Sequence, residues 1–285
     1  MLRCPRCGGA LASARFLVRC EACGPYPLLG DVPVLVSDPF AYCRTYRDAI
    51  LATMAEHDAA DREAVAVVEA FAGDAHGPTE GFGDDWTSHE AKGDEAPKPV
   101  KGAGAAALSK LMQVARDDGP AQWLERKMGK AGLALEIGCG AGERSEVLAS
   151  RVERLMVADL SLRAVFRARA RASRQSAEVM GVVMDAETLP LKKRSVDLLV
   201  AEHVVDLLDA PADFFAQARA SLAKGGRLLL TTPEPGLGSE EDDTVERLAL
   251  DAKFRVKERR EGLPWLRVNS SRFVEVYLVQ ALELV

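Results

Sequence analysis

The pattern of apolar and polar positions changes three times along the 285-residue chain. Up to residue 37, short apolar runs alternate with Cys-Gly turns, which predicts a small β-rich module. From residue 38 to 72, residues such as Ile50, Met54 and Val68 recur at helical spacing, which predicts a helical connector. Residues 73–104 are rich in Gly, Pro and acidic residues, a composition typical of a flexible linker or lid. Trp86, within this segment, is expected to dock elsewhere on the protein.

From residue 105 to 285, apolar runs that predict strands alternate with amphipathic runs that predict helices. The strand runs are LALEIG, LMVADL, VMGVVMD, VDLLVAEH and GRLLLTTP, and the chain closes with the alternating run RFVEVYLVQALEL. Near-continuous apolar strands between helices indicate a parallel sheet with helices on both faces. The predicted fold class is therefore α/β, with a Rossmann-like sheet preceded by the small β-rich module.

Composition and charge narrow the class of protein. Hydrophobic residues at 48% and charged residues at 28% are close to globular averages. The net charge of −6 argues against a surface built wholly for nucleic acid, although a local basic patch remains open. No apolar run approaches the roughly 18 residues of a membrane helix, and the start MLRCPRC has no apolar signal core. We expect a soluble, cytoplasmic protein.

Four of the six cysteines are spaced C-x2-C-x12-C-x2-C; they are Cys4, Cys7, Cys20 and Cys23. Four thiolates at this spacing can meet at one tetrahedral Zn²⁺, and without an export signal the cluster indicates metal ligation more than disulfides. Four cysteines leave no position for water, so the ion would be structural. Redox dithiols and iron are the alternatives. Because about 37 residues cannot bury enough apolar area, the metal should supply most of the folding energy.

The stretch CPRCGGAL…LVRCEACGPYPLLGDVPVLV, about residues 3–36, resembles the zinc-ribbon family of small activator proteins that partner tRNA and translation-factor methyltransferases. The likeness rests on the two Cys knuckles, the Tyr26-Pro27 step and the Asp31-Val32-Pro33-Val34 turn and strand. The ribbon of the rRNA guanine methyltransferases is a looser match. Members of the activator family are separate subunits, so the resemblance implies a stabilising role within this chain, with a protein partner at the ribbon as a further expectation.

A glycine-rich turn follows the first strand of the large domain. It contains, in order, Glu136, Gly138, Cys139, Gly140 and Gly142. The dinucleotide fingerprint G-x-G-x-x-G is not met, because position 143 is Glu. A carboxylate near a helix N-terminus occupies the place where a pyrophosphate would bind, so a cofactor without phosphates fits better.

Acidic residues end the next two strands. Asp159 is placed to accept hydrogen bonds from both ribose hydroxyls of an adenosine lying over the glycine turn. Asp185 can accept from an adenine amino group, while the N–H of Ala186 can donate to the ring. Either carboxylate alone could be a solvated strand-end acid, but three strand ends in the correct order favour a nucleoside cofactor.

Together, LEIGCGAGERS, VADLS, MDAETLPL, VDLLVAEHVVDLL and LAKGGRLLLTTP resemble the class I S-adenosylmethionine-dependent methyltransferases over about residues 105–285. The resemblance implies a seven-stranded sheet, S-adenosylmethionine as cofactor and methyl transfer as reaction. It departs from the family at Lys192-Lys193-Arg194, where an acidic turn is usual. The cofactor-binding residues that it implies are Glu136, Gly138, Cys139, Gly140, Gly142, Asp159, Leu160, Asp185, Ala186 and Glu202.

His203 and Asp206 are the candidates for chemistry on the substrate side. With an ordinary pKa of about 6.5, His203 suits a general base, although a polar residue that only shapes the pocket is the more ordinary interpretation. Asp206 is the weaker candidate. Cys139 lies between two glycines, where a small side chain fits, and a nucleophilic role is not favoured.

An arginine stripe on the helix 162–175 keeps RNA open as a substrate; it comprises Arg163, Arg167, Arg171 and Arg174, with Arg169 beside it. Such a stripe can track phosphates, but more often it is the solvated face of a helix packed on a sheet. The ribbon is also basic, through Arg3, Arg6, Arg15 and Arg19.

The sequence therefore predicts an S-adenosylmethionine-dependent methyltransferase with a structural zinc ribbon, acting on a small metabolite or an RNA base. Glu202-His203-Val204-Val205 lacks the N-P-P-Y-type signature of amino-directed methylation on nucleic acid. The alternative is a non-catalytic cofactor-binding scaffold that acts through its ribbon.

Overall fold

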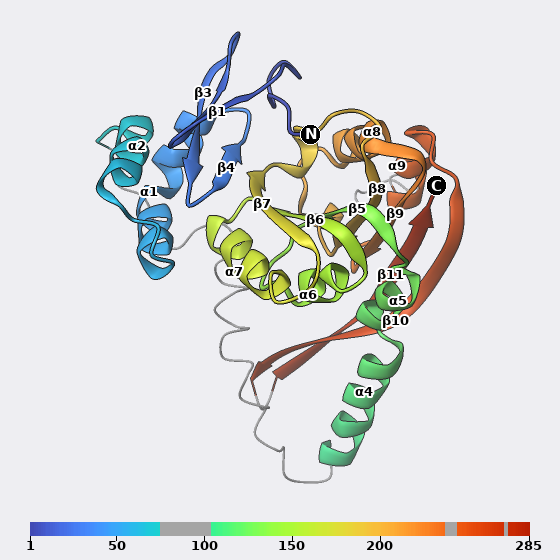
Figure 1. Ribbon diagram of the computed structural model, residues 1–285. Coiled ribbons are helices and arrows are strands. Elements are labelled where there is room, and N and C mark those ends of the chain that lie inside the picture. Colours follow the sequence, from blue (N-terminus) through green and yellow to red (C-terminus); the bar gives the residue numbers. More distant parts are fainter. Residues whose placement is uncertain (75–103, 237–243, 271–272) are drawn as a thin grey trace.

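Across the residues that the structure describes, eleven strands form one sheet (Figure 1). The computed structural model describes residues 1–74, 104–236, 244–270 and 273–285. The strand order is β1-β2-β3-β4-β7-β6-β5-β8-β9-β11-β10. The predicted linker or lid, including Trp86, lies outside the described residues except at its ends.

The last seven strands of that order form the predicted α/β sheet. Five are parallel: β7 (Glu178–Met184), β6 (Val152–Asp159), β5 (Ala131–Ile137), β8 (Val196–Glu202) and β9 (Leu222–Thr232). The final two, β11 (Phe273–Leu284) and β10 (Val256–Ser270), are antiparallel to their neighbours. The helices between strands are α6 (Glu143–Ala149), α7 (Leu162–Ala172), α8 (Pro211–Ser221) and α9 (Val245–Asp251). This arrangement confirms the predicted fold class.

Alternate residues of each central strand enter separate cores on the two faces of the sheet, as the two-residue period of a strand requires. In β6, Val157 belongs to the core under α6 and α7, whereas Met156 belongs to the core under α8 and α9. Both faces of the central sheet are therefore buried against helices, which explains the near-continuous apolar runs of these strands.

The N-terminal module extends this sheet instead of standing apart from it. Its strands are β1 (Ala12–Ala14), β2 (Leu17–Cys20), β3 (Gly24–Leu29) and β4 (Val32–Leu35). β4 pairs in parallel with β7, Val34 opposite Val183 and Leu35 opposite Met184. All four residues of β4 are buried, so the module shares its apolar core with the large domain. The domain limits at residues 37, 72 and 104 stay predictions.

Two helices follow the module within the predicted connector, α1 (Pro39–Glu56) and α2 (Arg62–Ala72). The carboxylate of Asp38 caps α1 by accepting from the N–H groups of Phe40 (3.1 Å) and Ala41 (2.9 Å). Asp61 caps α2 in the same way. These side chains occupy the N-terminal N–H groups that have no partner inside a helix.

Two arginines of the predicted stripe and the neighbouring Arg169 face the N-terminal half of the chain from α7. Arg163 and Arg167 each lie 3.5 Å from the carboxylate of Glu56, and Arg169 donates to the carbonyl oxygen of Gly30 at 3.1 Å. Phe166, between them, stacks on His57 with ring centroids 4.9 Å apart. Three of the five arginines therefore serve an internal interface, a role that neither the phosphate-tracking nor the solvated-face interpretation includes.

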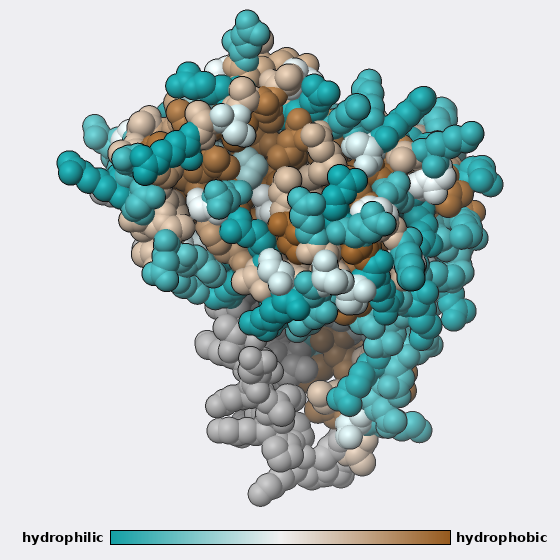
Figure 2. All heavy atoms as spheres, viewed as in Figure 1, coloured by the Kyte–Doolittle hydropathy of each residue, from teal (hydrophilic) through white to brown (hydrophobic). Residues whose placement is uncertain are grey.

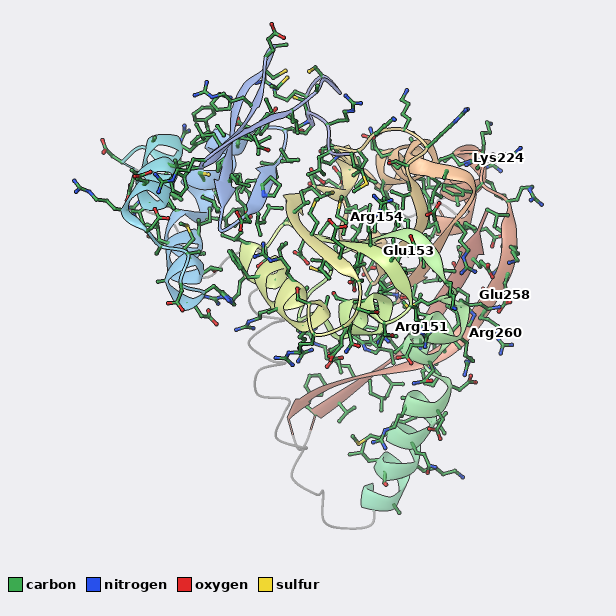
Figure 3. The ribbon with its side chains drawn as sticks, viewed as in Figure 1. Arg151, Glu153, Arg154, Lys224, Glu258 and Arg260 are labelled. Atoms are coloured by element: carbon green, nitrogen blue, oxygen red, sulfur yellow. The ribbon has the colours of Figure 1, made fainter. Side chains whose placement is uncertain are left out.

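The C-terminal edge of the sheet carries a long hairpin. β11 pairs with β9 only over residues 280–284, whereas its pairing with β10 continues to Phe273, so the hairpin extends past β9 (Figure 1). The helices α4 (Gly104–Asp118) and α5 (Pro120–Lys127) pack beside it. Trp123 of α5 donates to Glu258 at 3.1 Å, and Arg151 donates to the Met128 carbonyl at 3.1 Å. Figure 3 labels Glu258 and Arg151.

On the face shown in Figure 2, apolar side chains gather over the N-terminal module and the adjoining end of the sheet, with hydrophilic side chains around them. In the part of the chain that the structure describes, no helix has both the length and the apolarity that crossing a bilayer requires.

Candidate functional site

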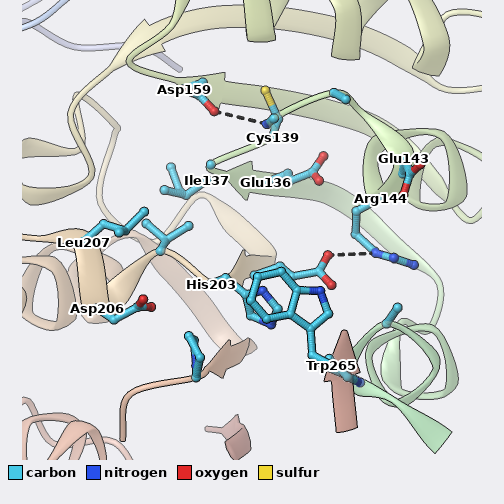
Figure 4. A pocket seen from close by; sticks show the side chains of 18 of the residues that line it. Glu136, Ile137, Cys139, Glu143, Arg144, Asp159, His203, Asp206, Leu207 and Trp265 are labelled. Atoms are coloured by element: carbon cyan, nitrogen blue, oxygen red, sulfur yellow. Dashed lines mark hydrogen bonds and ion pairs between the residues drawn. The ribbon is translucent and has the colours of Figure 1, made fainter. Parts of the chain in front are cut away.

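A cavity of about 940 Å³ opens at the carboxyl ends of β5, β6, β7 and β8 (Figure 4). This is the edge at which open α/β sheets bind ligands. The α4–α5 junction and the β10–β11 hairpin complete its walls. Every cofactor-binding residue predicted from the sequence lines the cavity, and so do His203 and Asp206. Their individual roles stay predictions.

The glycine turn forms a bare floor because its backbone geometry excludes side chains. Gly138, Gly140 and Gly142 have φ of +69°, +48° and +85°, values that favour glycine. A Cβ on Gly142 would lie 2.4 Å from the Cα of Ala168 in α7, and one on Gly138 would lie 2.4 Å from Val204. The turn therefore packs closely against both neighbours while its upper surface faces the cavity.

Asp159 lies at the end of β6, across from that floor. One carboxylate oxygen accepts from the N–H of Gly140 at 3.1 Å, and the other accepts from the N–H of Ser161 at 2.9 Å (Figure 4). The hydroxyl of Ser161 in turn caps α7 by accepting from Ala164 N–H. The carboxylate is thus held between the glycine turn and the start of α7.

Asp185 ends β7 on the neighbouring side of the cavity. Its carboxylate accepts from the N–H of Glu187 at 2.9 Å and caps a short 3-10 helix, Ala186–Thr188. Ala186 is buried directly behind it. The first three strand ends of the predicted cofactor site therefore converge on one cavity.

Burial favours the protonated form of two side chains beneath the turn, Glu136 and Cys139. Burial raises the pKa of Glu136 to about 8, and the Ser145 hydroxyl donates to its carboxyl group. Burial also raises the pKa of the Cys139 thiol well above its ordinary value. A protonated thiol is a poor nucleophile, which agrees with the packing role expected for Cys139.

The sequence did not flag Arg144, which joins three walls of the cavity. Its Nε donates to Glu202 of β8 at 3.0 Å (Figure 4), and an Nη donates to Glu125 of α5 at 2.7 Å. The partners lie 58 and 19 residues away, so no local signal could identify them. The ion pair fixes α5 against the end of β8.

The opposite end of the cavity is aromatic. The His203 ring meets the ring of Trp265 from β10 at a centroid distance of 4.3 Å, tilted by 60° (Figure 4). Trp265 in turn lies 5.0 Å from Tyr277 of β11. Burial lowers the pKa of His203 below its ordinary value, and its buried Nε2 has no hydrogen-bond partner among the described residues. The alternating pattern near the C-terminus indicated a strand but not which residues face the cavity.

The ionisable residues of the cavity wall are mostly acidic. Arg116 and Arg144 are its basic residues. The carboxyl groups on the wall belong to Glu136, Glu143, Asp159, Asp185, Glu202, Asp206 and Glu234. Such a wall favours cationic ligands over anionic ones.

The four cysteines of the ribbon meet at one point, with all Sγ atoms within 4.8 Å of one another. The Sγ atoms of Cys7 and Cys20 are 3.5 Å apart. A tetrahedral zinc ion with Zn–S bonds of about 2.3 Å would hold its sulfurs about 3.8 Å apart, so the cluster fits that ion. The hydroxyl of Tyr26, 3.1 Å from the Sγ of Cys4, adds a polar contact behind the ligands. The cluster is consistent with a zinc site.

Residues 135–230, which include the glycine turn, Asp159 and Asp185, match the Methyltransferase domain family. The chain contains an S-adenosylmethionine-dependent methyltransferase domain. Among curated proteins, it is similar to an uncharacterized 37.1 kDa protein of transposon Tn4556 from Streptomyces fradiae, with 36% identity over 104 residues. That alignment covers 35% of this chain and 30% of the relative, so the chain spans about a third of the relative's length.

The methyltransferase domain is also similar to solved structures. An S-adenosylmethionine-dependent methyltransferase from Mesorhizobium loti has 15% identity, coverage of 59% and 98% of the two chains, and a TM-score of 0.46. The N-methyltransferase NodS of Bradyrhizobium japonicum has 21% identity, coverage of 62% and 94% of the two chains, and a TM-score of 0.44. A chain of the complex between the Haloferax volcanii Trm112 methyltransferase activator and a methyltransferase has 15% identity, coverage of 64% and 96% of the two chains, and a TM-score of 0.46. The resemblance of residues 3–36 to the activator family stays a prediction.

Proposed function

We propose that the protein transfers the methyl group of S-adenosylmethionine to a small, ring-containing acceptor that lies against Trp265 and His203. The supporting observation is a single cavity with the glycine turn and the strand-end carboxylates at one end and His203, Trp265 and Tyr277 at the other. Ligand cavities typically measure about 300–1,000 Å³. A cavity of about 940 Å³ therefore has room for a cofactor and a small acceptor together.

The cofactor end fits S-adenosylmethionine on the chemistry of its donors. Open space above Gly140, where no atom lies within 4 Å of an added Cβ, leaves room for the ligand to cross the turn. Asp159 and Asp185 supply carboxylates for ribose hydroxyls and for the adenine amino group. The acidic wall suits the positive charge of a sulfonium. Glu202 also lines the cavity, where it accepts from Arg144.

S-adenosylmethionine supplies a methyl group that is already activated, so the protein's task is mainly to position the reactants. Because burial lowers the pKa of His203, its imidazole is neutral near pH 7. Nε2 is buried in the structure. A rotation of the His203 ring that exposes it would let it accept the proton that an acceptor hydroxyl or ring N–H must lose. The edge of Trp265 and the ring of Tyr277 provide stacking surfaces beside it.

The charges of the site favour a small neutral or cationic acceptor over RNA. Among the described residues, seven carboxyl groups and two arginines line the cavity. Burial favours the neutral form of Glu136 and Arg144 pairs with Glu202, so the five other carboxylates outnumber Arg116 and repel phosphates. Three arginines of α7 are also engaged with Glu56 and Gly30. RNA remains an outcome of the test below.

We also propose that a structural zinc ion at Cys4, Cys7, Cys20 and Cys23 stabilises the N-terminal module within this chain. The ring of four thiols has the geometry for a closed tetrahedral site. Because the backbones of β4 and β7 are paired, a stabilised module would also stabilise the adjoining strand of the large domain.

Cofactor binding is tested with S-adenosylhomocysteine by calorimetry and thermal shift. At about 100 times its Kd, the ligand should stabilise the protein by about 2.7 kcal/mol. Asp159→Ala should weaken binding about 10- to 100-fold, because it removes charge-assisted hydrogen bonds to the ribose. Asp213→Ala, which removes an exposed carboxylate of α8, is the matched control and should leave Kd unchanged. Wild-type protein that is not stabilised by the ligand would contradict the proposal.

The acceptor is tested by following labelled methyl from S-adenosylmethionine into two fractions of cell extract. We expect label in the small-molecule fraction, and loss of that label with Trp265→Ala. Label in purified RNA instead would contradict the small acceptor. Binding of S-adenosylhomocysteine without transfer into either fraction would favour the non-catalytic scaffold.

A further inference from the structure

Tyr42 links the connector helix α1 to the loop that carries Asp159. Its hydroxyl donates to the carbonyl oxygen of Leu160 at 2.6 Å, across 118 residues of sequence. The Tyr42 side chain is buried, with 8% of its surface exposed. It lies in the first turn of α1, four residues after the cap Asp38 and close behind β4. The contact thus runs from the N-terminal half of the chain to the cofactor end of the cavity.

The bonded carbonyl belongs to the same peptide unit as the N–H of Ser161. A trans peptide unit is planar, and its C=O and N–H point in opposite directions. Tyr42 holds the oxygen, while the N–H of Ser161 donates to Asp159 at 2.9 Å. Rotation of this unit would break both hydrogen bonds together. The Tyr42 hydroxyl therefore fixes the donor that orients the Asp159 carboxylate.

The rest of α1 is held firmly enough for this contact to matter. Glu56, at the end of α1, lies 3.5 Å from Arg163 and from Arg167 of α7. His57 stacks on Phe166 of the same helix. α7 begins directly after its cap Ser161. The two helices and the loop 159–161 therefore form one packed unit.

We propose that Tyr42 is a positioning residue for the cofactor, through which the N-terminal half of the chain supports the cofactor site from outside the cavity. The inference rests on the proposed function, because it assumes that Asp159 binds the ribose. Tyr42 does not line the cavity; it acts through the Leu160–Ser161 peptide and Asp159.

The test uses Tyr42→Phe, which removes one hydroxyl and keeps the ring. Loss of this hydrogen bond should raise the Kd of S-adenosylhomocysteine about fivefold, measured by calorimetry on the zinc-loaded full chain. Tyr46→Phe is the matched control: its ring lies beside that of Tyr42 in the same helix, at 5.2 Å. It should leave Kd unchanged. Equal Kd values for wild type and Tyr42→Phe, or equal losses in both variants, would overturn the proposal.

A double-mutant cycle separates positioning from general destabilisation. If Tyr42 acts through Asp159, adding Tyr42→Phe to Asp159→Ala should weaken binding by much less than fivefold further. Losses that multiply fully would show that the hydroxyl acts elsewhere and would overturn the assignment.

A second measurement does not depend on the ligand. Amide hydrogen exchange at Ser161 in the free protein should be faster in Tyr42→Phe than in wild type or Tyr46→Phe. Unchanged exchange would refute the role of Tyr42 in holding this peptide. Failure of wild-type protein to bind S-adenosylhomocysteine would instead refute the proposed function, so the two failures are distinguishable.

Discussion

The two halves of the cavity are formed by different kinds of chemical groups. The cofactor half, Gly138–Gly142 with Asp159 and Asp185, consists of backbone and short acids at the ends of parallel strands. The acceptor half, His203 with Trp265 and Tyr277, depends on large side chains, two of them from the terminal hairpin. That hairpin extends past β9, and its Leu278 is 67% exposed. The cofactor half is thus tied to the core of the fold, while much of the acceptor half is not.

This difference determines what substitutions should do. A change in the cofactor half disturbs the packing of several strands and helices, so it should affect stability and cofactor binding together. Over most of its length, β11 pairs with β10 but not with β9. A substitution on this part of the hairpin therefore changes a surface that is not paired with the rest of the sheet. Acceptor affinity should then change with little effect on folding.

Of the changes considered, loss of the zinc ion should have the largest effect on stability. Within the cavity, it should weaken the cofactor half and not the acceptor half. Structural zinc in small ribbons contributes about 10–16 kcal/mol of apparent binding free energy. Cys20→Ala should lose the zinc and unfold β1 to β3, so that β4 and α1 lose their support. We expect a fall of Tm by about 10 °C or more, together with weaker binding of S-adenosylhomocysteine. Metal analysis, calorimetry and thermal unfolding provide the measurements.

The control for the zinc ligand is Cys43→Ala. Cys43 is a buried cysteine of α1 outside the four-thiol cluster, and burial raises the pKa of its thiol to about 12. The control should retain one zinc per chain and lose about 1 kcal/mol of stability from the small cavity. A Cys20→Ala protein with full zinc content and unchanged Tm would show that the cluster does not stabilise the module.

Gly142→Ala should have the next largest effect. Gly142 combines a φ of +85° with a Cβ position 2.4 Å from the backbone of Ala168, so alanine adds strain and a clash. We expect a loss of about 2–4 kcal/mol in unfolding free energy and loss of cofactor binding. Gly225→Ala is the control, since its φ is +80° with open space around the Cβ. It should lose only about 1 kcal/mol. Equal losses at both glycines would mean that close packing on α7 is unimportant.

Trp265→Ala should act on the acceptor half alone. Removal of the indole takes away one stacking surface, worth about 1.4 kcal/mol, and should raise the KM for the acceptor about tenfold. The Kd of S-adenosylhomocysteine should stay within about twofold of wild type, because cofactor contacts lie at the opposite end. Trp265→Phe keeps a ring and should restore most of the affinity. An equal loss of cofactor and acceptor affinity in Trp265→Ala would contradict the division into halves.

The same division explains what the sequence could predict. The glycine turn, Asp159 and Asp185 each follow an apolar strand within a few residues, so local patterns identify both the strand and its ligand-facing end. Trp265 and Tyr277 lie more than 60 residues beyond His203, and only the folded hairpin brings them to it. The arginines of α7 and the bond from Tyr42 to Leu160 likewise depend on the parallel pairing of β4 with β7. No spacing within the chain encodes those contacts.

The pH dependence of His203 should give the smallest effect. Burial lowers the pKa of His203 in the folded protein, whereas the unfolded chain titrates near its ordinary value of about 6.5. The unfolded state therefore binds more protons as the pH falls below 6.5, so unfolding free energy should drop there, by at most about 1.4 kcal/mol per pH unit. Turnover should stay constant from pH 8 to 6.5 and fall at lower pH, as Nε2 becomes protonated. His203→Gln should remove the share of His203 in the acid sensitivity of folding, and the turnover that remains should no longer fall below pH 6.5.

His57→Gln is the matched control for this pH dependence, because burial also lowers the pKa of His57 and its buried Nε2 has no partner among the described residues. His57 packs on Phe166 and does not line the cavity. Its replacement should therefore reduce the acid sensitivity of folding while the pH profile of turnover stays that of wild type. A turnover profile that moves with His57→Gln, and not with His203→Gln, would exclude His203 as the proton acceptor and leave it as a wall of the acceptor half.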